Sequence, residues 1–165
     1  RDRYKVDGLM RKGAEIDSFG VGTRMSTSYD RPYVDVVYKL SGKDEKGVFI
    51  PAMKLSKGKM TLPGKKQIFR QHDERGNYVK DIIGLADEGV EGEQLLVKVI
   101  EKGKVVYDLP LLENVRENAL RNLSRLPGKY KNLRKAPLYP VELSPTLKRI
   151  KKSLRNQLRR HEDLS

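Results

Sequence analysis

The sequence predicts an α/β segment at the N-terminus, then a small antiparallel β-sheet, then C-terminal helices. Three observations predict this order. Residues 1–28 combine a helical apolar stripe with a glycine-rich loop, residues 29–110 show period-two alternation and turn residues, and a helical period returns in residues 111–165. These three ranges are the domains that we expect.

The first part predicts a helix, a strand and a loop. Apolar residues at spacings of three and four predict a helix over residues 4–14, which Gly13 can close. Ile16-Asp17-Ser18-Phe19 predicts a brief strand that ends in Gly20-Val21-Gly22-Thr23. Helix, strand and glycine-rich loop form one unit of an α/β fold, and we expect these residues to be the second half of that unit.

The middle part predicts short strands joined by turns. Alternating apolar residues predict the first strand over 34–40, and further strands are expected over 48–50, 53–55, 67–71, 78–83, 95–100 and 104–109. Ser41-Gly42, Leu62-Pro63-Gly64 and residues 73–77 have the composition of the breaks between them. Glu101-Lys102-Gly103 predicts a hairpin turn, because glycine readily adopts a positive φ.

The last part predicts two helices. A stripe from Leu112 to Leu126 predicts the first, and Pro127-Gly128 ends it. Residues 130–141 contain two prolines and are expected to form an irregular crossing. Ser144-Pro145 is typical of a helix start. The expected buried face of the final helix consists of Leu147, Ile150, Leu154 and Leu158.

Composition narrows the function classes. The 165 residues contain 35 Lys and Arg against 22 Asp and Glu, a formal charge of +13, and no Cys. A chain without Cys has no disulfide framework and no thiolate metal site, which fits a cytoplasmic protein. No apolar stretch reaches the roughly 20 residues of a membrane-spanning helix, so we expect no membrane partner.

The positive charge is concentrated in residues 111–165, which hold 14 basic and 5 acidic residues, a net of +9. This asymmetry raises the hypothesis of a free-standing module that binds RNA or another polyanion, with an affinity that falls steeply with salt. Nucleic-acid binding is disfavoured because the basic final helix lacks aromatic residues for base stacking. A second basic group surrounds residues 61–64, where a solvated surface is the favoured interpretation. It comprises Lys54, Lys57, Lys59, Lys65, Lys66 and Arg70.

The loop Gly20-Val21-Gly22-Thr23 is the most informative local feature. Alternate glycines let a backbone approach an anion, successive N–H groups can point at phosphate oxygens, and Thr23 adds a hydroxyl donor. An isolated motif of this kind more often only turns the chain. It matches neither the dinucleotide fingerprint nor a P-loop, since no Gly-Lys-Ser/Thr follows.

Other catalytic chemistry has no support in the sequence. His72 and His161 lack partners at metal-ligand spacing and are expected on the surface. Asp73 and Glu74 are adjacent and would point to different sides, so they form no acid/base pair. We therefore assign no catalytic residue and no metal ligand to this chain.

Four segments, in this order, resemble nicotinate phosphoribosyltransferases near their C-terminus. They are Ile16 to Thr23, Val37-Tyr38-Lys39-Leu40, Met53-Lys54-Leu55-Ser56 and Thr61 to Arg70. The resemblance is closest over residues 13–83. Residues 118–133 followed by 139–144 are similar in layout to the family's C-terminal helix, crossing strand and final helix.

The resemblance implies a fold and an activity. Residues 1–28 would be the last strand–helix part of a type II phosphoribosyltransferase α/β barrel, and Gly20, Val21, Gly22 and Thr23 would bind the 5′-phosphate of the phosphoribosyl group. The family converts nicotinate and 5-phosphoribosyl 1-diphosphate into nicotinate mononucleotide and diphosphate, with ATP and Mg²⁺, usually as a homodimer. Its phosphorylated histidine matches neither histidine here. We therefore expect one segment of a longer enzyme, inactive without the remainder.

A related enzyme acting on nicotinamide or quinolinate is the nearest alternative. The choice of nicotinate depends on the stretch from Lys39 to Arg70. Activity of the complete enzyme on each base would decide between them.

Overall fold

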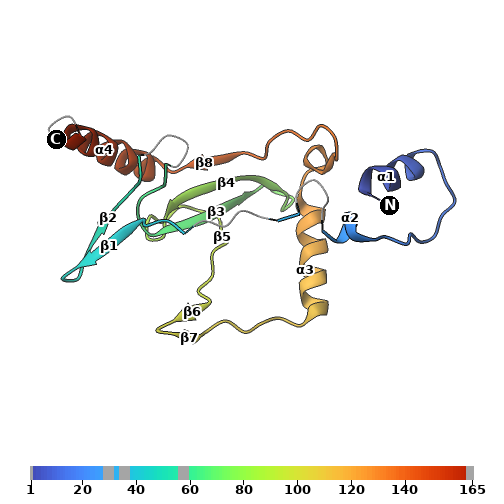
Figure 1. The fold of residues 1–165 in the computed structure, drawn as a ribbon, viewed down its shortest axis with the longest axis horizontal. Coiled ribbons are helices and arrows are strands. Elements are labelled where there is room, and N and C mark those ends of the chain that lie inside the picture. The colour runs from blue at the N-terminus through green and yellow to red at the C-terminus, as the bar shows by residue number, and fades with distance from the viewer. Residues whose placement is uncertain (1, 28–31, 34–37, 56–59, 163–165) are drawn as a thin grey trace. The chain divides into compact units, whose positions relative to one another are not determined.

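The computed structural model describes residues 2–27, 32–33, 38–55 and 60–162, and its contacts divide the chain into two units, Arg1–Tyr38 and Lys39–Ser165 (Figure 1). Most of the strand predicted over 34–40 lies outside the described residues. Within it, Tyr38 and Leu40 belong to no strand and are 101% and 67% exposed.

The first unit contains α1 (Arg3–Arg11) and the short α2 (Thr23–Ser26). Asp2 caps α1, because its Oδ1 accepts a hydrogen bond of 3.0 Å from the backbone N–H of Lys5. This bond holds the pKa of Asp2 below its usual value. Gly13 follows the helix with a φ of +69°, so the predicted helix and its glycine stop are both confirmed.

The strand predicted over Ile16–Phe19 is wrong for the chain as described. These residues connect α1 to α2 and join no sheet among the described residues. A strand exists only where a neighbouring strand accepts and donates its backbone hydrogen bonds. Two apolar residues, Ile16 and Phe19, next to glycines do not supply that neighbour.

The second unit is built on a four-stranded sheet in the order β5-β3-β4-β8. Its strands are β3 (Lys66–His72), β4 (Tyr78–Leu85), β5 (Glu93–Gln94) and β8 (Val141–Leu143). The β3–β4 hairpin confirms the strands predicted over 67–71 and 78–83. β5 pairs antiparallel with β3, whereas β8 returns from far along the chain and pairs parallel with β4.

Two further hairpins form two-stranded sheets of their own. They are β1 (Gly42–Glu45) with β2 (Val48–Pro51), and β6 (Ile100–Glu101) with β7 (Lys104–Val105). Both turn on a Lys-Gly pair with two positive φ angles, 53° and 82° at residues 46 and 47 and 48° and 78° at residues 102 and 103. The hairpin turn at 101–103 and the strand over 48–50 were predicted, whereas β1 was not. The strands predicted over 95–100 and 104–109 are wrong in length, since β6 and β7 have two residues each.

The strand predicted over Met53–Leu55 is wrong. The backbone of Lys54 bonds to Thr61 instead of to a strand, since Lys54 N–H donates to Thr61 Oγ1 at 2.9 Å and Thr61 N–H donates to the Lys54 carbonyl at 3.3 Å. These two bonds close a loop, so the apolar residues in it have no ladder to join.

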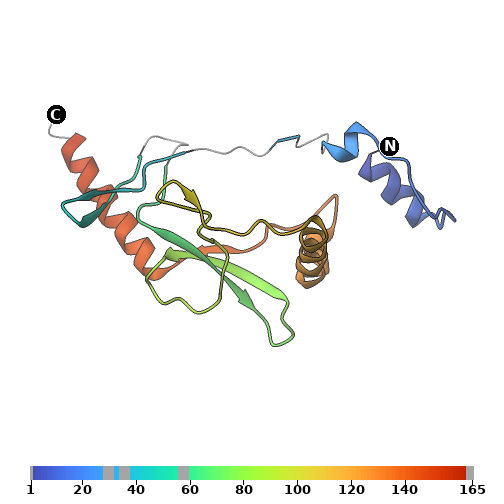
Figure 2. The same ribbon diagram turned by 90° about the horizontal axis from the view of Figure 1, so that it is seen from below.

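The predicted C-terminal helices are confirmed. They are α3 (Leu112–Arg125) and α4 (Pro145–Glu162), with the short η1 (Gly128–Lys131) after α3. The two long helices lie at opposite ends of the four-stranded sheet (Figures 1 and 2). No helix in the described ranges has the length and apolar character needed to cross a membrane.

The core of the second unit lies between the β3–β4 hairpin and the start of α4. Phe69 of β3 is 1% exposed and Leu147 of α4 is 0% exposed. Gly84 of β4 allows this approach, because a Cβ there would come within 3.3 Å of the Phe69 ring and 2.9 Å of a Glu88 oxygen. The predicted inner face of α4 is buried or half-buried, as expected.

Glu88 and Ser144 join the end of β4 to the start of α4. Glu88 Oε2 accepts from the Ser144 hydroxyl at 2.6 Å and from the Leu85 N–H at 3.0 Å. Ser144 is fully buried, and its oxygen accepts from the Leu147 N–H at 3.1 Å, which caps α4. Burial raises the pKa of Glu88, but the hydrogen bonds outweigh burial and leave that pKa below its usual value.

We predict that Glu88→Ala lowers the free energy of unfolding by about 2 kcal/mol, because the Ser144 hydroxyl and the N–H groups of Leu85 and Thr146 lose their acceptor. In the wild type, the depressed pKa stabilises the folded state above the ordinary glutamate range, and this contribution is lost as the pH falls through the folded pKa. Urea unfolding at pH 7 and at successively lower pH measures both effects.

The control is Asp87→Asn, which removes an exposed neighbouring carboxylate. It should leave the stability at pH 7 within about 0.5 kcal/mol of the wild type. Equal effects of the two substitutions would contradict the role assigned to Glu88.

Candidate phosphate-binding loop

The loop Gly20-Val21-Gly22-Thr23 lies between the segment that follows α1 and the first residue of α2. Its glycines are not needed to turn the chain. Gly22 has φ −121°, and neither it nor Gly20 has a positive φ. A Cβ on either glycine would meet nothing within 4 Å. The described chain therefore gives neither a backbone nor a packing reason for glycine at these positions, whereas the positive φ of Gly13 is such a reason.

The loop presents free donors to solvent. Among the described residues, no acceptor takes the backbone N–H groups of residues 20–23, and Val21 is 52% exposed. Two of the four carbonyls are occupied, since that of Gly22 accepts from the Ser26 N–H at 3.3 Å and that of Thr23 accepts from the Thr27 N–H at 2.9 Å. The loop can therefore donate hydrogen bonds to an anion while these two carbonyls remain bonded within α2.

Arg24 lies directly after the loop and is oriented by the first helix. Its Nη1 is 3.4 Å from Asp2 Oδ2, the carboxylate that also caps α1. The pair ties α2 to the start of α1 within the first unit. The guanidinium of the residue that follows the loop is thus held against the Asp2 carboxylate, which offsets part of its positive charge.

The basic group around residues 61–64 is not a continuous cationic surface. Lys54 and Lys65 are exposed, and Lys57 and Lys59 lie outside the described residues. Lys66 turns inward, where its Nζ donates to the carbonyls of Leu62 at 2.9 Å and Gly64 at 2.8 Å, and burial lowers its pKa. Lys66 therefore holds the turn together.

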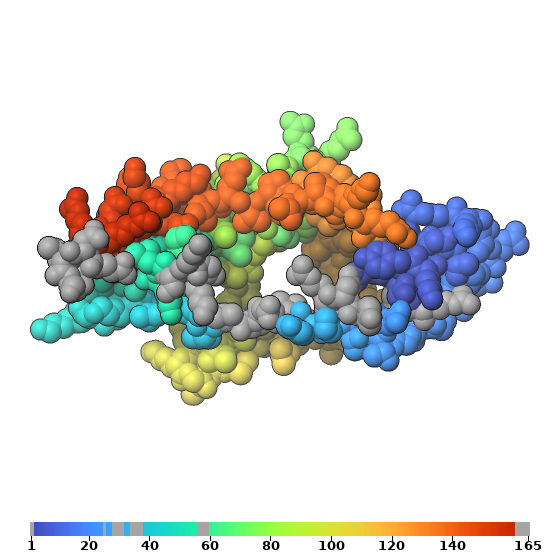
Figure 3. Space-filling model, turned by 45° about the horizontal axis from the view of Figure 1, so that its top comes forward, coloured from blue at the N-terminus to red at the C-terminus, as the bar shows by residue number. Residues whose placement is uncertain are grey.

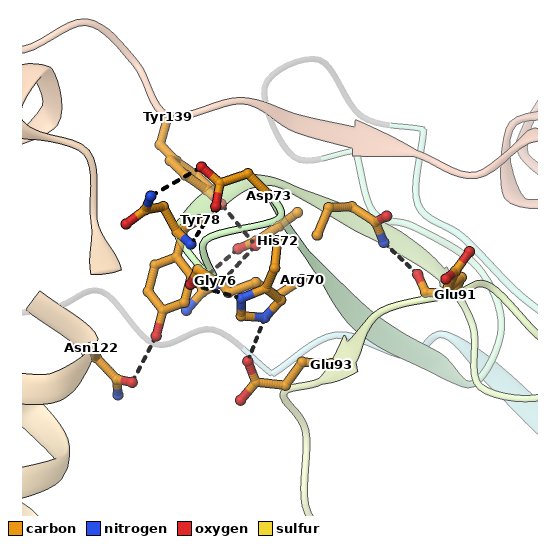
Figure 4. Close-up of polar contacts among 12 residues, drawn as sticks. Arg70, His72, Asp73, Gly76, Tyr78, Glu91, Glu93, Asn122 and Tyr139 are labelled. Atoms are coloured by element: carbon orange, nitrogen blue, oxygen red, sulfur yellow. Dashed lines mark hydrogen bonds and ion pairs between the residues drawn. The ribbon is translucent and has the colours of Figure 1, made fainter. Parts of the chain in front are cut away.

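Arg70 also points inward, into a polar cluster on the sheet (Figure 4). Its guanidinium forms two hydrogen bonds of 2.9 Å with the Asp81 carboxylate across the β3–β4 pair. The guanidinium carbon lies 4.3 Å from the centre of the Tyr78 ring. The hydrogen bonds with Asp81 raise the pKa of Arg70, so this cation is committed to the fold.

Two tyrosines connect this cluster to the C-terminal elements. The Tyr139 hydroxyl donates to Asp81 Oδ1 at 3.3 Å, and burial together with the Asp81 charge raises the pKa of Tyr139 to about 12. The Tyr78 hydroxyl donates to Asn122 Oδ1 of α3 at 2.7 Å (Figure 4). The cluster therefore positions both α3 and the irregular segment of residues 130–141 against the sheet.

The predicted surface position of His72 is confirmed. His72 is a surface residue whose Nε2 lies 2.9 Å from Glu93 Oε2, and Asp73 caps its own turn by accepting from the N–H groups of Arg75 and Asn77. The side chain of His161 lies outside the described part. In that part, no group of three acidic, His or Cys side chains could hold a metal ion.

The Arg70–Asp81 pair is the feature that the sequence analysis missed. Arg70 was grouped with the surface cations, although residues 70 and 81 are register partners across the turn at 73–77. Opposite charges placed symmetrically about a predicted hairpin turn were the available signal.

Comparison with known proteins agrees with this architecture. Residues 89–151 match the family model described as "Nicotinate phosphoribosyltransferase C-terminal domain". The nicotinate phosphoribosyltransferase of Bacillus subtilis is 31% identical over 87% of this chain and 34% of its own length. The resemblance to nicotinate phosphoribosyltransferases is confirmed.

Other relatives give the same result. The nicotinate phosphoribosyltransferase pncB2 of Mycobacterium tuberculosis is 33% identical over 87% of this chain and 30% of its own length. The crystal structure of human nicotinic acid phosphoribosyltransferase is similar with a TM-score of 0.55 and 28% identity, over 61% of this chain and 24% of that one. The chain spans about a third of the length of the curated relatives it matches.

These comparisons also bear on the alternative function. Residues 89–151 include α3 and the first turns of the basic α4, so much of the positively charged part lies within the match to the family model of an enzyme's C-terminal domain. The hypothesis of a free-standing RNA-binding module is therefore not favoured.

We predict that Arg70→Met lowers the free energy of unfolding by roughly 2–3 kcal/mol, because Asp81 is left buried without its counter-charge. The double variant Arg70→Met with Asp81→Val should be less destabilised than the sum of the single variants. Denaturant unfolding of all four proteins provides this cycle. Lys65→Met, which removes an exposed cation, is the control and should change stability little; additive effects in the cycle would refute the pairing.

Proposed function

We propose that this chain is the C-terminal part of a nicotinate phosphoribosyltransferase, and that the whole polypeptide forms nicotinate mononucleotide in NAD biosynthesis. The observation that carries the proposal is the match of residues 89–151 to the family's C-terminal domain. Matches to the curated relatives extend it over 86–93% of the chain.

The proposed reaction joins two anionic substrates. The ring nitrogen of nicotinate attacks C1′ of 5-phosphoribosyl 1-diphosphate, the C1′–O bond breaks, and diphosphate leaves with the bonding electron pair. ATP and Mg²⁺ are the expected cofactors, and we assign no residue of this chain to either. Diphosphate departure and phosphate binding both require cationic or N–H donors around the substrate.

The loop of residues 20–23 is proposed to bind the 5′-phosphate. Its support is physical: the N–H groups of Gly20 to Thr23 face no acceptor in the described chain, and the basic residue Arg24 follows them in the sequence. Glycine at positions 20 and 22 would let the phosphate oxygens approach the backbone closely. Thr23 would add a hydroxyl donor from the first turn of α2.

The remaining parts of the proposal concern the context of the enzyme. We propose a homodimer in the cytoplasm, in which the rest of the same enzyme supplies the pyridine-binding residues and the phosphorylated histidine. Nicotinate is preferred to nicotinamide and quinolinate because the relatives are named for nicotinate. Assays of the longer polypeptide with each of the three bases would test this preference.

We predict that Gly22→Ala in the longer polypeptide raises the KM for 5-phosphoribosyl 1-diphosphate by roughly tenfold or more, while its thermal midpoint is unchanged or slightly higher. The structure tolerates a methyl group at this position, but a phosphate bound against the backbone would not. Steady-state kinetics and calorimetry measure the two quantities. Gly8→Ala, the same substitution in the middle of α1, is the control and should leave the KM unchanged.

We further predict that Thr23→Val raises the same KM by roughly tenfold, because one hydrogen bond to a charged group is lost while the side-chain shape is kept. The KM for nicotinate should remain constant. If both variants leave the KM for 5-phosphoribosyl 1-diphosphate unaltered, the loop does not bind its phosphate.

A further inference from the structure

A cavity lies beside the β1–β2 hairpin, within the second unit of the chain. Its volume is about 390 Å³, and it extends from β2 and the turn before β3 to the loop after β4 and to α4. Figure 3 shows the cyan hairpin and the orange-to-red α4 side by side. Cavities of roughly 300–1,000 Å³ are typical of sites for small molecules. This cavity is therefore large enough to hold one.

The walls of the cavity are apolar and are held in place by close packing. They consist of Phe49, Pro51, Leu85 and Ile150, all of which are half-buried. The Phe49 ring lies against the backbone of Gly42, because a Cβ on that glycine would overlap the ring. Gly64 has a φ of +89°, and a Cβ there would come within 2.6 Å of Leu85 Cδ2. The aromatic wall and one aliphatic wall are thus fixed by the fold.

Backbone hydrogen bonds join the segments that form the cavity. The Ser41 carbonyl accepts from the N–H groups of Ala52 at 2.9 Å and Gly64 at 2.7 Å, which ties the hairpin to the turn before β3. The Ala86 N–H donates to the Lys65 carbonyl at 3.0 Å, which ties this turn to the loop after β4. The cavity is therefore formed in advance, and a ligand would have to order little of the chain.

Two opposite charges also line the cavity. Lys65 and Asp87 are both exposed, and they form no ion pair with each other. The Lys65 Nζ lies 4.8 Å from the centre of the Phe49 ring, next to the aromatic wall. The Asp87 carboxylate forms no hydrogen bond or ion pair with any described residue. One cation and one anion are therefore available beside the apolar walls.

We propose that this cavity binds an amino acid with an apolar side chain. The side chain of the ligand contacts the apolar walls, its carboxylate pairs with Lys65, and its ammonium group pairs with Asp87. The proposal concerns the second unit alone, so it does not depend on the proposed function.

The two charges select this class of ligand. A zwitterion pairs with both Lys65 and Asp87. A ligand with a single charge would pair with one of them and bring a like charge close to the other. A wholly apolar ligand would take both charges out of water without supplying a partner to either.

L-phenylalanine is the ligand for the first test, because its ring can stack against Phe49. It is titrated into the isotope-labelled 165-residue chain, and the amide NMR signals are followed. Saturable shifts are expected at residues 49–50, 64–65, 85–87 and 150, with a Kd of roughly 1 mM. The absence of saturable shifts at these residues up to about 20 mM ligand would overturn the proposal.

Three compounds that each lack one part of the ligand test the assigned contacts. Hydrocinnamate lacks the ammonium group, phenethylamine lacks the carboxylate, and glycine lacks the apolar side chain. Each should bind at least roughly tenfold more weakly than L-phenylalanine, because one ion pair or the apolar contact is lost. If hydrocinnamate bound as tightly as L-phenylalanine, the site would be one for monocarboxylates. Equal binding of phenethylamine would make it a site for amines, and either result would overturn the proposal.

Variants of the two charged residues connect each charge to one group of the ligand. Lys65→Met should weaken L-phenylalanine binding at least roughly tenfold and leave phenethylamine binding unweakened, since phenethylamine has no carboxylate. Asp87→Asn should weaken L-phenylalanine binding and leave hydrocinnamate binding unweakened. Both substitutions are expected to change stability little, so weaker binding would not reflect unfolding.

Lys54→Met is the matched control. Lys54 is an exposed lysine of the same region, and it does not line the cavity. Its substitution should leave the affinity for L-phenylalanine unchanged. Equal effects of Lys54→Met and Lys65→Met would show a general attraction to positive charge and would overturn the pairing with Lys65.

Discussion

The hydrogen-bonded junction between Glu88 and Ser144 is the constraint on which the packing of the second unit depends. Ser144 donates its hydroxyl hydrogen to Glu88 and accepts the N–H of Leu147, so one buried oxygen both caps α4 and ties it to the loop after β4. The N–H of Ser144 donates to the Ile83 carbonyl at 2.9 Å, which extends the parallel pairing of β4 with β8 up to the helix. The position of α4, and hence the burial of Leu147, follows from these bonds.

Local chemistry predicted this junction in part. Ser144-Pro145 specifies a helix start by itself, because serine caps and proline suits the first helical position. The turn at Glu101-Lys102-Gly103 was equally readable. The same three residues at 45–47 form the other hairpin, yet β1 was missed because Ser41-Gly42 resembles a break. The partner of Ser144 was not predictable, since Glu88 lies 56 residues away and no pattern links the two.

The two wrong strand predictions share a physical cause. A strand forms only when a second segment pairs with the first. Apolar residues at 16–19 and 53–55 satisfy the preference of one segment, but the first finds no ladder in the described chain and the second closes a loop with Thr61. The prediction for Arg70 was wrong for the opposite reason. Its charge predicted a solvent-exposed side chain, but the register of the hairpin places it opposite Asp81. The candidate loop differs from both, because its elements of recognition are local: glycines, N–H groups and a hydroxyl.

Some glycines and one long helix of this chain have features that the described contacts do not explain. Gly47 and Gly103 are explained by positive φ angles, and Gly84 by the side chains around it, but Gly20 and Gly22 have neither explanation. The two long helices divide in the same way, since α4 buries its stripe and α3 exposes one of similar spacing. Net charge alone would direct attention to the basic face of α4, which is adequately explained as the solvated side of a packed helix. Among the described residues, the glycines of the candidate loop and the apolar stripe of α3 are therefore positions that the packing of the chain itself does not explain.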